Sequence, residues 1–281
     1  MSISLGKGGA ERSCALLSEM LHEQGYEVHL AILNDDIDYP FKGTLLNLGK
    51  LKKQKDGFGN RMNRLLKLRK YLKEHQIDLV IDHRTKNNYP RELFYQNMIY
   101  KGFRKIYVVH SANPDLYLTN KPVQFAKVYN RNVRTVGVSN HITAAILPQY
   151  GIENAVTLHN AFDPEWEKNG STPPKMLLGK KYFLSYGRID DAVKDYSFLL
   201  RAFNASKVWE TELNLVVMGS GPDLPKLQRL AEQLPAGRHI FFVEHISNPF
   251  PIIKNAQFVT LTSRFEGFPM VLVETLSLGI P

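Results

Sequence analysis

The sequence predicts an α/β protein in which parallel β-sheets are covered by helices. Along nearly all of its 281 residues, short apolar runs alternate with longer polar or amphipathic segments. This alternation is typical of β-α-β units, in which a helix connects two parallel strands. It is interrupted once, by the turn-rich segment NGSTPP at 169–174, and then restarts. Two domains are therefore expected, residues 1–172 and 173–281.

The first domain is expected to begin with a glycine loop and a helix. Residues 8–25 have the apolar periodicity of a helix, and Gly25 is a typical helix stop. A basic amphipathic helix is expected at 60–76. Short apolar runs of the buried-strand type predict the strands, which are expected at 26–33, 78–82, 105–110, 134–139 and 155–159.

The second domain repeats the pattern. Strands are expected at 181–187, 213–219, 239–243 and 258–262, and helices at 196–206, 224–234, 251–255 and 270–278. Only a short segment that begins MSIS precedes the first glycine loop, so the first strand is expected to be shortened. The chain stops at GIP, directly after a helix, so the second domain is expected to be incomplete and the chain truncated.

Composition and charge narrow the possible classes. No run of 18 apolar residues occurs, so a membrane-spanning helix is not expected, and the N-terminus does not have the pattern of a signal peptide. Cys14 is the single cysteine, which excludes an internal disulfide and indicates the cytoplasm. We expect Cys14 to be a small buried apolar residue rather than a catalytic thiol.

The net charge of +9 is concentrated in one stretch. Between Lys50 and Lys73 there are ten basic residues and one acid, Asp56. Such a stretch suits phosphates, anionic lipid or nucleic acid, or is simply the solvated face of a helix. Residues Gly59–Gln76 could lie on an anionic membrane. A nucleic-acid-binding protein is the alternative, but no aromatic stacking platform accompanies the basic run.

Two glutamates near the C-terminus form the clearest candidate site. Glu266 and Glu274 are eight residues apart, and Gly267 and Pro269 between them allow a turn from a loop into a helix. Both carboxylates could then face the carboxyl end of a strand, where open α/β sheets bind ligands. An ionised carboxylate accepts hydrogen bonds from sugar hydroxyls. By themselves, the two residues could also be ordinary surface charges.

Two cations and a glycine turn complete the candidate site. Arg188 and Lys194 lie in a loop that leads into a helix, a typical arrangement for binding a diphosphate. Cations placed there would stabilise the charge that develops when a nucleoside diphosphate leaves a sugar. The turn formed by Gly219 and Gly221 would let the backbone approach a ligand closely, although such a turn is often only structural.

In order and spacing, these three elements resemble the donor domain of family 4 glycosyltransferases. The shared pattern is a Gly-Arg…Lys loop, a G-x-G-P turn and an E-G-F-P…E segment, and the resemblance covers nearly the whole chain. It implies two Rossmann-like domains whose parallel sheets face a cleft. It also implies transfer of a sugar from a UDP- or GDP-sugar to a hydroxyl, with retention of anomeric configuration.

The resemblance also assigns roles in the second domain. Arg188 and Lys194 match the pair that binds the donor diphosphate, and Glu274 matches the carboxylate that binds the ribose. Glu266 matches the carboxylate near the hydroxyls of the donor sugar. The backbone that lines the donor sugar is matched by Gly267, Phe268 and Pro269.

In the first domain, Gly8 and Gly9 match the glycine loop that approaches the donor phosphate. His110, at the end of an expected strand, matches a histidine that faces the transferred sugar, but strand-end histidines are often only structural. His83 ends another expected strand and is a weaker candidate, for a contact with the acceptor.

A metal ion is not expected, because the two cations would replace it. Asp36 and Asp38 form a D-x-D string, but their position indicates an acidic loop. The implied acceptor is a saccharide or a lipid-linked saccharide in surface polysaccharide synthesis, at the cytoplasmic face of the membrane. A nucleotide-sugar epimerase of similar fold is an alternative. A dinucleotide oxidoreductase is disfavoured, because GKGGAE is not G-x-G-x-x-G.

Overall fold

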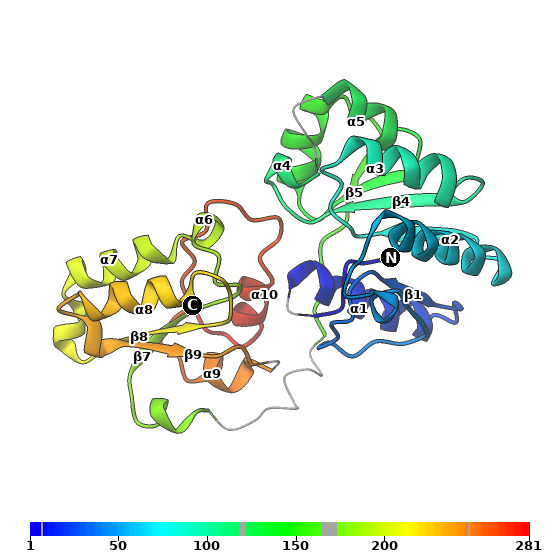
Figure 1. The fold of residues 1–281 in the computed structure, drawn as a ribbon. Helices are drawn as coiled ribbons and strands as arrows, with labels where there is room; N and C mark the ends of the chain where they lie inside the picture. The colour runs from blue at the N-terminus through cyan, green and yellow to red at the C-terminus, as the bar shows by residue number, and fades with distance from the viewer. Residues whose placement is uncertain (7, 118–121, 164–172, 247) are drawn as a thin grey trace. The chain divides into compact units, whose positions relative to one another are not determined.

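The computed structural model confirms the α/β prediction (Figure 1). It describes residues 1–6, 8–117, 122–163, 173–246 and 248–281. All the strand pairs that it contains among these residues are parallel, and helices lie in most of the connections between successive strands. Most of the predicted linker, residues 169–172, lies outside the described residues.

The chain forms two compact units. Unit 1 contains Met1–Ala161 together with Glu266–Phe268, and unit 2 contains Phe162–Phe265 together with Pro269–Pro281. Each unit has a Rossmann-like arrangement of its own.

Unit 1 is built on parallel strands, most of which the sequence predicts. β1 pairs with β2, and β3, β4, β5 and β6 form a second sheet in that order. The strands are β1 (His29–Ile32), β2 (Thr44–Asn47), β3 (Leu79–Asp82), β4 (Arg104–Val109), β5 (Arg134–Gly137) and β6 (Ala155–Thr157). β2 was not predicted from the sequence.

The N-terminal residues lie between these two sheets. Ser2 forms a parallel bridge with Ile32 at the end of β1. On the other side, the N–H of His83 donates to the carbonyl of Met1 at 2.9 Å. The short first segment therefore takes the place of a strand between β1 and β3.

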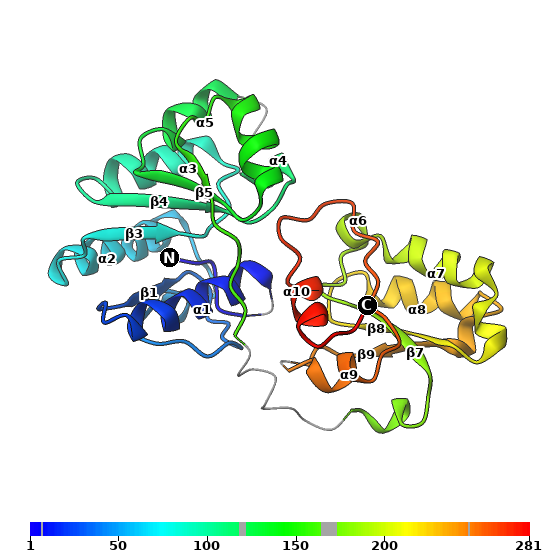
Figure 2. The same ribbon diagram turned by 180° about the vertical axis from the view of Figure 1, so that it is seen from behind.

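Helices cover both faces of the strands in unit 1 (Figure 2). Leu30 and Ile32 of β1 pack with Cys14 of α1, whereas Ala31 packs in the cluster that contains Leu68 of α2. This alternation follows from the two-residue period of a strand. The helices are α1 (Gly9–Glu23), α2 (Phe58–Glu74), α3 (Tyr89–Phe94), α4 (Pro114–Tyr117) and α5 (Pro122–Tyr129).

Two details of α1 agree with the sequence. Gly25 has φ +83° and donates its N–H to the carbonyl of His22, while Tyr26 donates to Leu21, so the helix ends in a Schellman motif. Cys14 is 4% exposed, and burial raises the pKa of its thiol. Cys14 is thus a buried apolar residue rather than a reactive thiol.

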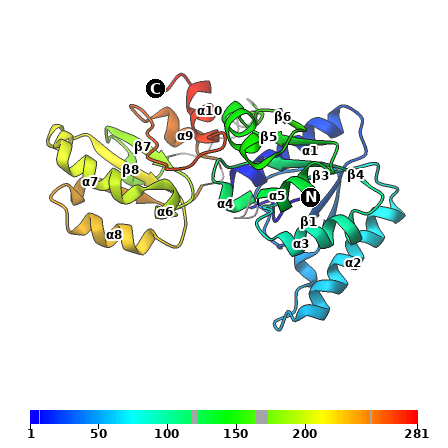
Figure 3. The ribbon, with the colours of Figure 1, turned by 90° about the horizontal axis from the view of Figure 1, so that it is seen from above.

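Unit 2 contains a parallel sheet in the order β7-β8-β9. Figure 3 labels its strands β7 and β8, with α9 on one side of them and α8 on the other. The predicted strand at 258–262 is reduced to a single bridge between Val259 and Leu184 of β7. The elements are β7 (Tyr182–Tyr186), α6 (Asp191–Lys194), α7 (Tyr196–Ser206), β8 (Asn214–Met218), α8 (Leu224–Glu232), β9 (Ile240–Val243), α9 (Phe250–Lys254) and α10 (Met270–Ser277).

The sheet of unit 2 is buried on both faces. Phe183 of β7 packs with Leu199 of α7 and Leu227 of α8, whereas Leu184 packs with Ile252 of α9. All five residues of β7 are buried, as expected for a parallel strand covered on both sides.

Within the described ranges, no helix is both long and apolar enough to cross a membrane.

Candidate functional site

In unit 2, the loop after β7 carries both predicted phosphate-binding cations. Arg188 follows β7 by two residues; its side chain is 58% exposed and lies 3.1 Å from the carboxylate of Asp190. Lys194 ends the short helix α6, and α7 begins two residues later. Both residues therefore belong to the connection between β7 and α7, at the carboxyl end of the strand.

Asp191 anchors this connection, and the sequence did not single it out. Its carboxylate accepts hydrogen bonds from the N–H and hydroxyl of Ser197 on α7, at 2.7 and 2.6 Å. It also accepts one from the ammonium of Lys226 on α8 at 2.7 Å. Burial raises the pKa of Asp191, but the hydrogen bonds from Ser197 and Lys226 lower it by more. The carboxylate is therefore ionised, and it ties α6 to α7 and α8.

The glycine turn packs directly on the same connection. Gly219 has φ +154°, and a Cβ there would lie 1.9 Å from the carbonyl oxygen of Gly187. A Cβ at Gly221 would lie 2.1 Å from the carbonyl oxygen of Ile189. Both glycines are thus explained by the close approach of two backbone segments, whether or not a ligand also lies there.

Glu274 is buried on α10 and faces the end of β7. Its residue is 1% exposed, and its Oε2 accepts a hydrogen bond of 2.7 Å from the hydroxyl of Tyr186, the last residue of the strand. The interpretation of Glu274 as a surface charge is therefore wrong. Tyr186 is a partner that sequence reasoning missed, because 88 residues separate the two.

In unit 1, the predicted glycine loop leads into α1. Gly8 is the N-cap residue of this helix, and among the described residues it has no side-chain cap. A Cβ at Gly8 would lie 2.2 Å from a carboxylate oxygen of Glu11, whereas Gly9 is exposed and faces open space. The 15-residue helix α1 thus begins with backbone N–H groups that could bind a phosphate.

The structure brings His83 and His110 together. They follow the neighbouring strands β3 and β4, and Nδ1 of His83 lies 2.9 Å from Nε2 of His110. The rings are stacked, with centroids 5.1 Å apart. Burial lowers the pKa of His110 to about 3, helped by the charge of Lys86. Burial and the neighbouring imidazole lower the pKa of His83 as well, so both rings are neutral at neutral pH.

The residues on both sides of His83 in the sequence belong to a buried ionic network. The carboxylate of Asp82 accepts two hydrogen bonds from the guanidinium of Arg84, at 3.0 and 2.7 Å. Arg84 also donates to Glu92 at 3.2 Å, and Lys86 donates to the carbonyl of Arg84 at 2.8 Å. All four charged residues are at most 2% exposed. They hold the backbone on both sides of His83 in one conformation.

Glu266, Gly267 and Phe268 belong to unit 1. The N–H of Ala112 donates to the carbonyl of Glu266 at 3.3 Å, and a Cβ at Gly267 would lie 2.0 Å from the carbonyl oxygen of His110. Within unit 1, this segment is thus adjacent to the end of β4.

Glu274 and Pro269 belong to unit 2, where Pro269 is the N-cap residue of α10. The two predicted glutamates are therefore described in separate units.

The D-x-D string lies in the loop after β1. The side chain of Asp36 lies over Gly6, where a Cβ would be 2.0 Å from Oδ2. In the part of the chain that the structure describes, no group of three or more His, Cys, Asp or Glu residues could hold a metal ion.

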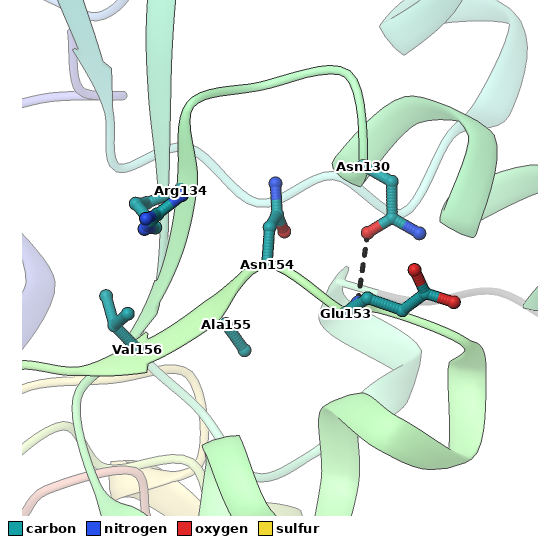
Figure 4. Close-up of a pocket in the computed structure, with 6 residues that line it drawn as sticks. All are labelled: Asn130, Arg134, Glu153, Asn154, Ala155 and Val156. Carbon is teal, nitrogen blue, oxygen red and sulfur yellow. Dashed lines mark hydrogen bonds between the residues drawn. The ribbon is translucent and has the colours of Figure 1, made fainter.

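A surface pocket lies elsewhere in unit 1 (Figure 4). It is at the edge of the sheet beside β6, and its lining includes Arg134 and Glu153. Asn130 accepts a hydrogen bond there from the N–H of Glu153 at 3.1 Å. None of the predicted site residues lines it, and it is located by the first residues of β5 and β6 rather than by their carboxyl ends.

Two family models match the chain. The model described as Glycosyltransferase Family 4 matches residues 7–166, and the model described as Glycosyl transferases group 1 matches residues 172–281.

Similar proteins include sugar transferases that act on lipid-linked saccharides. The chain is 26% identical over 98% of its length to a Campylobacter jejuni protein, N-acetylgalactosamine-N,N'-diacetylbacillosaminyl-diphospho-undecaprenol 4-alpha-N-acetylgalactosaminyltransferase, and covers 76% of it. It is 31% identical over 43% of its length to the lipopolysaccharide 1,6-galactosyltransferase of Salmonella typhimurium, and covers 34% of that protein.

Solved structures of the same fold cover the whole chain. Anabaena HepE in complex with UDP-glucose matches with a TM-score of 0.72 at 14% identity, and the match covers 79% of that protein. WaaG, a glycosyltransferase involved in lipopolysaccharide biosynthesis, matches with a TM-score of 0.71 at 16% identity and is also covered to 79%.

Proposed function

The chain belongs to glycosyltransferase family 4, and from this premise we propose the reaction that it performs. It transfers a hexosyl or N-acetylhexosaminyl group from a UDP- or GDP-sugar to a hydroxyl of a saccharide or lipid-linked acceptor, with retention of configuration. The relatives act on lipopolysaccharide and on an undecaprenol-diphosphate-linked saccharide, which supports an acceptor of this type in surface polysaccharide synthesis.

One observation in unit 2 carries this proposal. The end of β7 is adjacent to three features that the sequence singled out. The hydroxyl of Tyr186 donates a hydrogen bond to Glu274. The backbone of Gly187 and Ile189 contacts the glycine turn, and Arg188 lies between these two residues in the sequence. At the end of this strand, a carboxylate that accepts hydrogen bonds suits the hydroxyls of a ribose. The two cations and the glycine turn suit a diphosphate.

The proposed roles follow from charge. Arg188 and Lys194 bind the diphosphate and stabilise the negative charge that develops on it as the sugar leaves. Glu274 accepts hydrogen bonds from ribose hydroxyls. In unit 1, the N-terminus of α1 at Gly8 and Gly9 favours the negative charge of a phosphate. Glu266 and His110 contact the hydroxyls of the transferred sugar, and the backbone of Gly267, Phe268 and Pro269 lines it.

Substitution of the cations tests these roles. The wild-type chain is titrated calorimetrically with UDP and GDP, and donor turnover is measured with UDP-glucose, UDP-galactose, their N-acetylamino counterparts and GDP-mannose. Arg188→Ala and Lys194→Ala should each weaken binding of the preferred nucleotide about tenfold. Arg229→Ala, an exposed arginine on α8, is the matched control. Equal losses in all three variants, or no nucleotide binding by the wild type, would contradict the proposal.

A face of α2 supports peripheral binding to an anionic membrane, as part of the same proposal. Phe58 and Leu66 are 79% and 44% exposed, and Met62 lies between them at a spacing of four residues. Exposed cations flank this stripe, among them Arg61 and Lys67. The buried residues of α2 are Leu68 and Leu72, whereas Leu66 faces solvent.

Vesicle flotation tests this surface. Wild-type protein should float with vesicles that contain phosphatidylglycerol and not with pure phosphatidylcholine, and salt should release it. Phe58→Ser and Lys67→Glu should reduce flotation. Lys226→Glu is unsuitable as a control because Lys226 binds Asp191, so Lys207→Glu, on an exposed lysine of unit 2, is used. Salt-insensitive flotation, or none, would contradict membrane binding.

A further inference from the structure

His83 and His110 form a direct pair in unit 1 whose second member has an unsatisfied nitrogen. Nδ1 of His83 and Nε2 of His110 share one hydrogen bond of 2.9 Å. The other nitrogen of His110, Nδ1, is buried and has no hydrogen-bond partner among the described residues. A buried polar atom without a partner is costly in a folded protein, so such atoms often mark functional positions.

The hydrogen bond restricts where the two rings carry their protons. A neutral imidazole has one N–H and one lone pair, so only one ring can donate in the shared bond. If His83 donated, the buried Nδ1 of His110 would be an orphaned N–H. If His110 donates through Nε2, its Nδ1 is an orphaned lone pair instead. Orphaned donors are rarer in proteins than under-used acceptors, which favours the second arrangement.

His83 is held rigidly enough to impose this choice. Its backbone N–H donates to the carbonyl of Met1 at 2.9 Å. Its sequence neighbours Asp82 and Arg84 are 0% and 2% exposed and are bonded to each other. Since charged residues on both sides are locked in place, the imidazole of His83 has little freedom to turn away from His110.

We propose that His83 is a positioning residue for the transferred sugar: its Nδ1 accepts the Nε2–H of His110 and so presents Nδ1 of His110 as a hydrogen-bond acceptor. A sugar hydroxyl is the matching group, because its O–H can donate to that lone pair. This inference rests on the proposed function, in which His110 contacts the transferred sugar. The positioning role proposed for His83 differs from the expected one, which was a contact with the acceptor substrate.

Two variants of nearly equal shape separate positioning from packing. In His83→Asn, Oδ1 takes the place of Nδ1 of the imidazole and can still accept the hydrogen bond. In His83→Leu, a methyl group takes that place and no acceptor remains. His83→Leu should lower kcat/KM for the preferred nucleotide sugar about tenfold, through kcat, and His83→Asn should stay within about threefold of wild type. Affinity for the free nucleotide, UDP or GDP, should be unchanged in both, because neither carries a hexose.

The tautomer is measured independently of turnover. In protein labelled with ¹⁵N-histidine, ring-nitrogen NMR should show His110 protonated at Nε2 in the wild type and in His83→Asn. The His110 resonances are assigned with His110→Asn. In His83→Leu, a shift of the His110 proton towards Nδ1 is expected.

The proposal is overturned by a His110 proton on Nδ1 in the wild type, by an unchanged tautomer and rate in His83→Leu, or by equal losses in the two His83 variants. If wild-type protein turns over none of the nucleotide sugars, the proposed function fails, while the NMR measurement still decides whether His83 sets the tautomer. Normal turnover with the wrong tautomer would leave the proposed function intact and refute only the positioning role.

Discussion

The hydroxyl of Tyr186 donates a 2.7 Å hydrogen bond to Oε2 of Glu274, joining the end of β7 to the middle of α10. The same hydroxyl lies 3.2 Å from the carbonyl of Val271, one turn earlier on the helix. The hydrogen bond fixes the orientation of this buried carboxylate. The nucleotide site proposed for unit 2 therefore depends on a tyrosine as well as on the charged residues.

Tyr186→Phe should weaken nucleotide binding about fivefold, because Glu274 loses the hydrogen bond that orients it. Titration calorimetry with the preferred nucleoside diphosphate measures this. Tyr182→Phe is the matched control: Tyr182 is buried in the same strand, and its hydroxyl donates to the carbonyl of Ile252 at 2.6 Å. Both variants should lose similar stability. A similar loss of affinity in both would show that Tyr186 acts only through packing.

Gly221→Ala should destabilise unit 2 by about 2 kcal/mol, because the new Cβ would lie 2.1 Å from the carbonyl oxygen of Ile189. The displaced loop carries Arg188, so nucleotide affinity should fall as well. Urea unfolding and calorimetry measure the two effects. Gly59→Ala, in α2, should be neutral or slightly stabilising, because a Cβ there would meet nothing within 4 Å beyond its chain neighbours and the backbone of its own helix. Wild-type stability of Gly221→Ala would show that the loops separate easily.

Acid should destabilise unit 1 before its carboxylates titrate. Burial lowers the pKa of His110 from 6.5 to about 3 and lowers that of His83 too, so over this range the unfolded chain binds protons that the folded chain does not. The stability contributed by the neutral pair is present above about pH 6.5 and is lost as the pH falls towards 3. The pH dependence that Asp82 contributes has the same sign. Burial raises the pKa of Asp82, but the charges of Arg84 and Lys86 bring it below 3.8 overall.

Urea unfolding between pH 7 and pH 4 tests this dependence. The double variant His83→Asn/His110→Asn should have a flatter profile than the wild type. His22→Asn, at an exposed position near the end of α1, should retain the wild-type profile. If the wild type and the double variant lose stability in parallel, the pair does not cause the acid sensitivity.

Turnover is expected to continue in excess EDTA, because Arg188 and Lys194 supply the positive charge that a divalent ion supplies in other transferases. Initial rates with and without EDTA should agree within about twofold, the scatter that a difference of about 0.4 kcal/mol in barrier would produce. Loss of activity that Mn²⁺ or Mg²⁺ restores would refute this expectation and would make Asp36 and Asp38 the candidate metal ligands.

The order of the elements could be predicted because it depends on local patterns. The helix expected at 196–206 has those bounds in the structure, since its apolar period and its flanking residues are both local. The strand expected at 258–262 does not form in full, because the pairing of a strand depends on more than its local sequence. Its apolar run is real, but β7 pairs with it at Val259 alone, and pairing is a property of two segments.

The candidate site divides in the same way. Motif order along the chain was sufficient to select Arg188, Lys194 and Glu274 and to suggest the family. By itself, the sequence determined the fold class, most of the elements and the residue types that suit a nucleotide sugar.

Only the tertiary structure decided which side chains act together. It paired His83 with His110 and Tyr186 with Glu274, and it showed that Gly219 and Gly221 are needed for the contact between two loops. Partners that are 27 and 88 residues apart leave no periodic signal. His83 and His110 meet because parallel strands bring their carboxyl ends to one edge of a sheet, and Tyr186 meets Glu274 because α10 packs against the end of β7. Burial of the two imidazoles then lowers their pKa values, which no local pattern of the sequence could show.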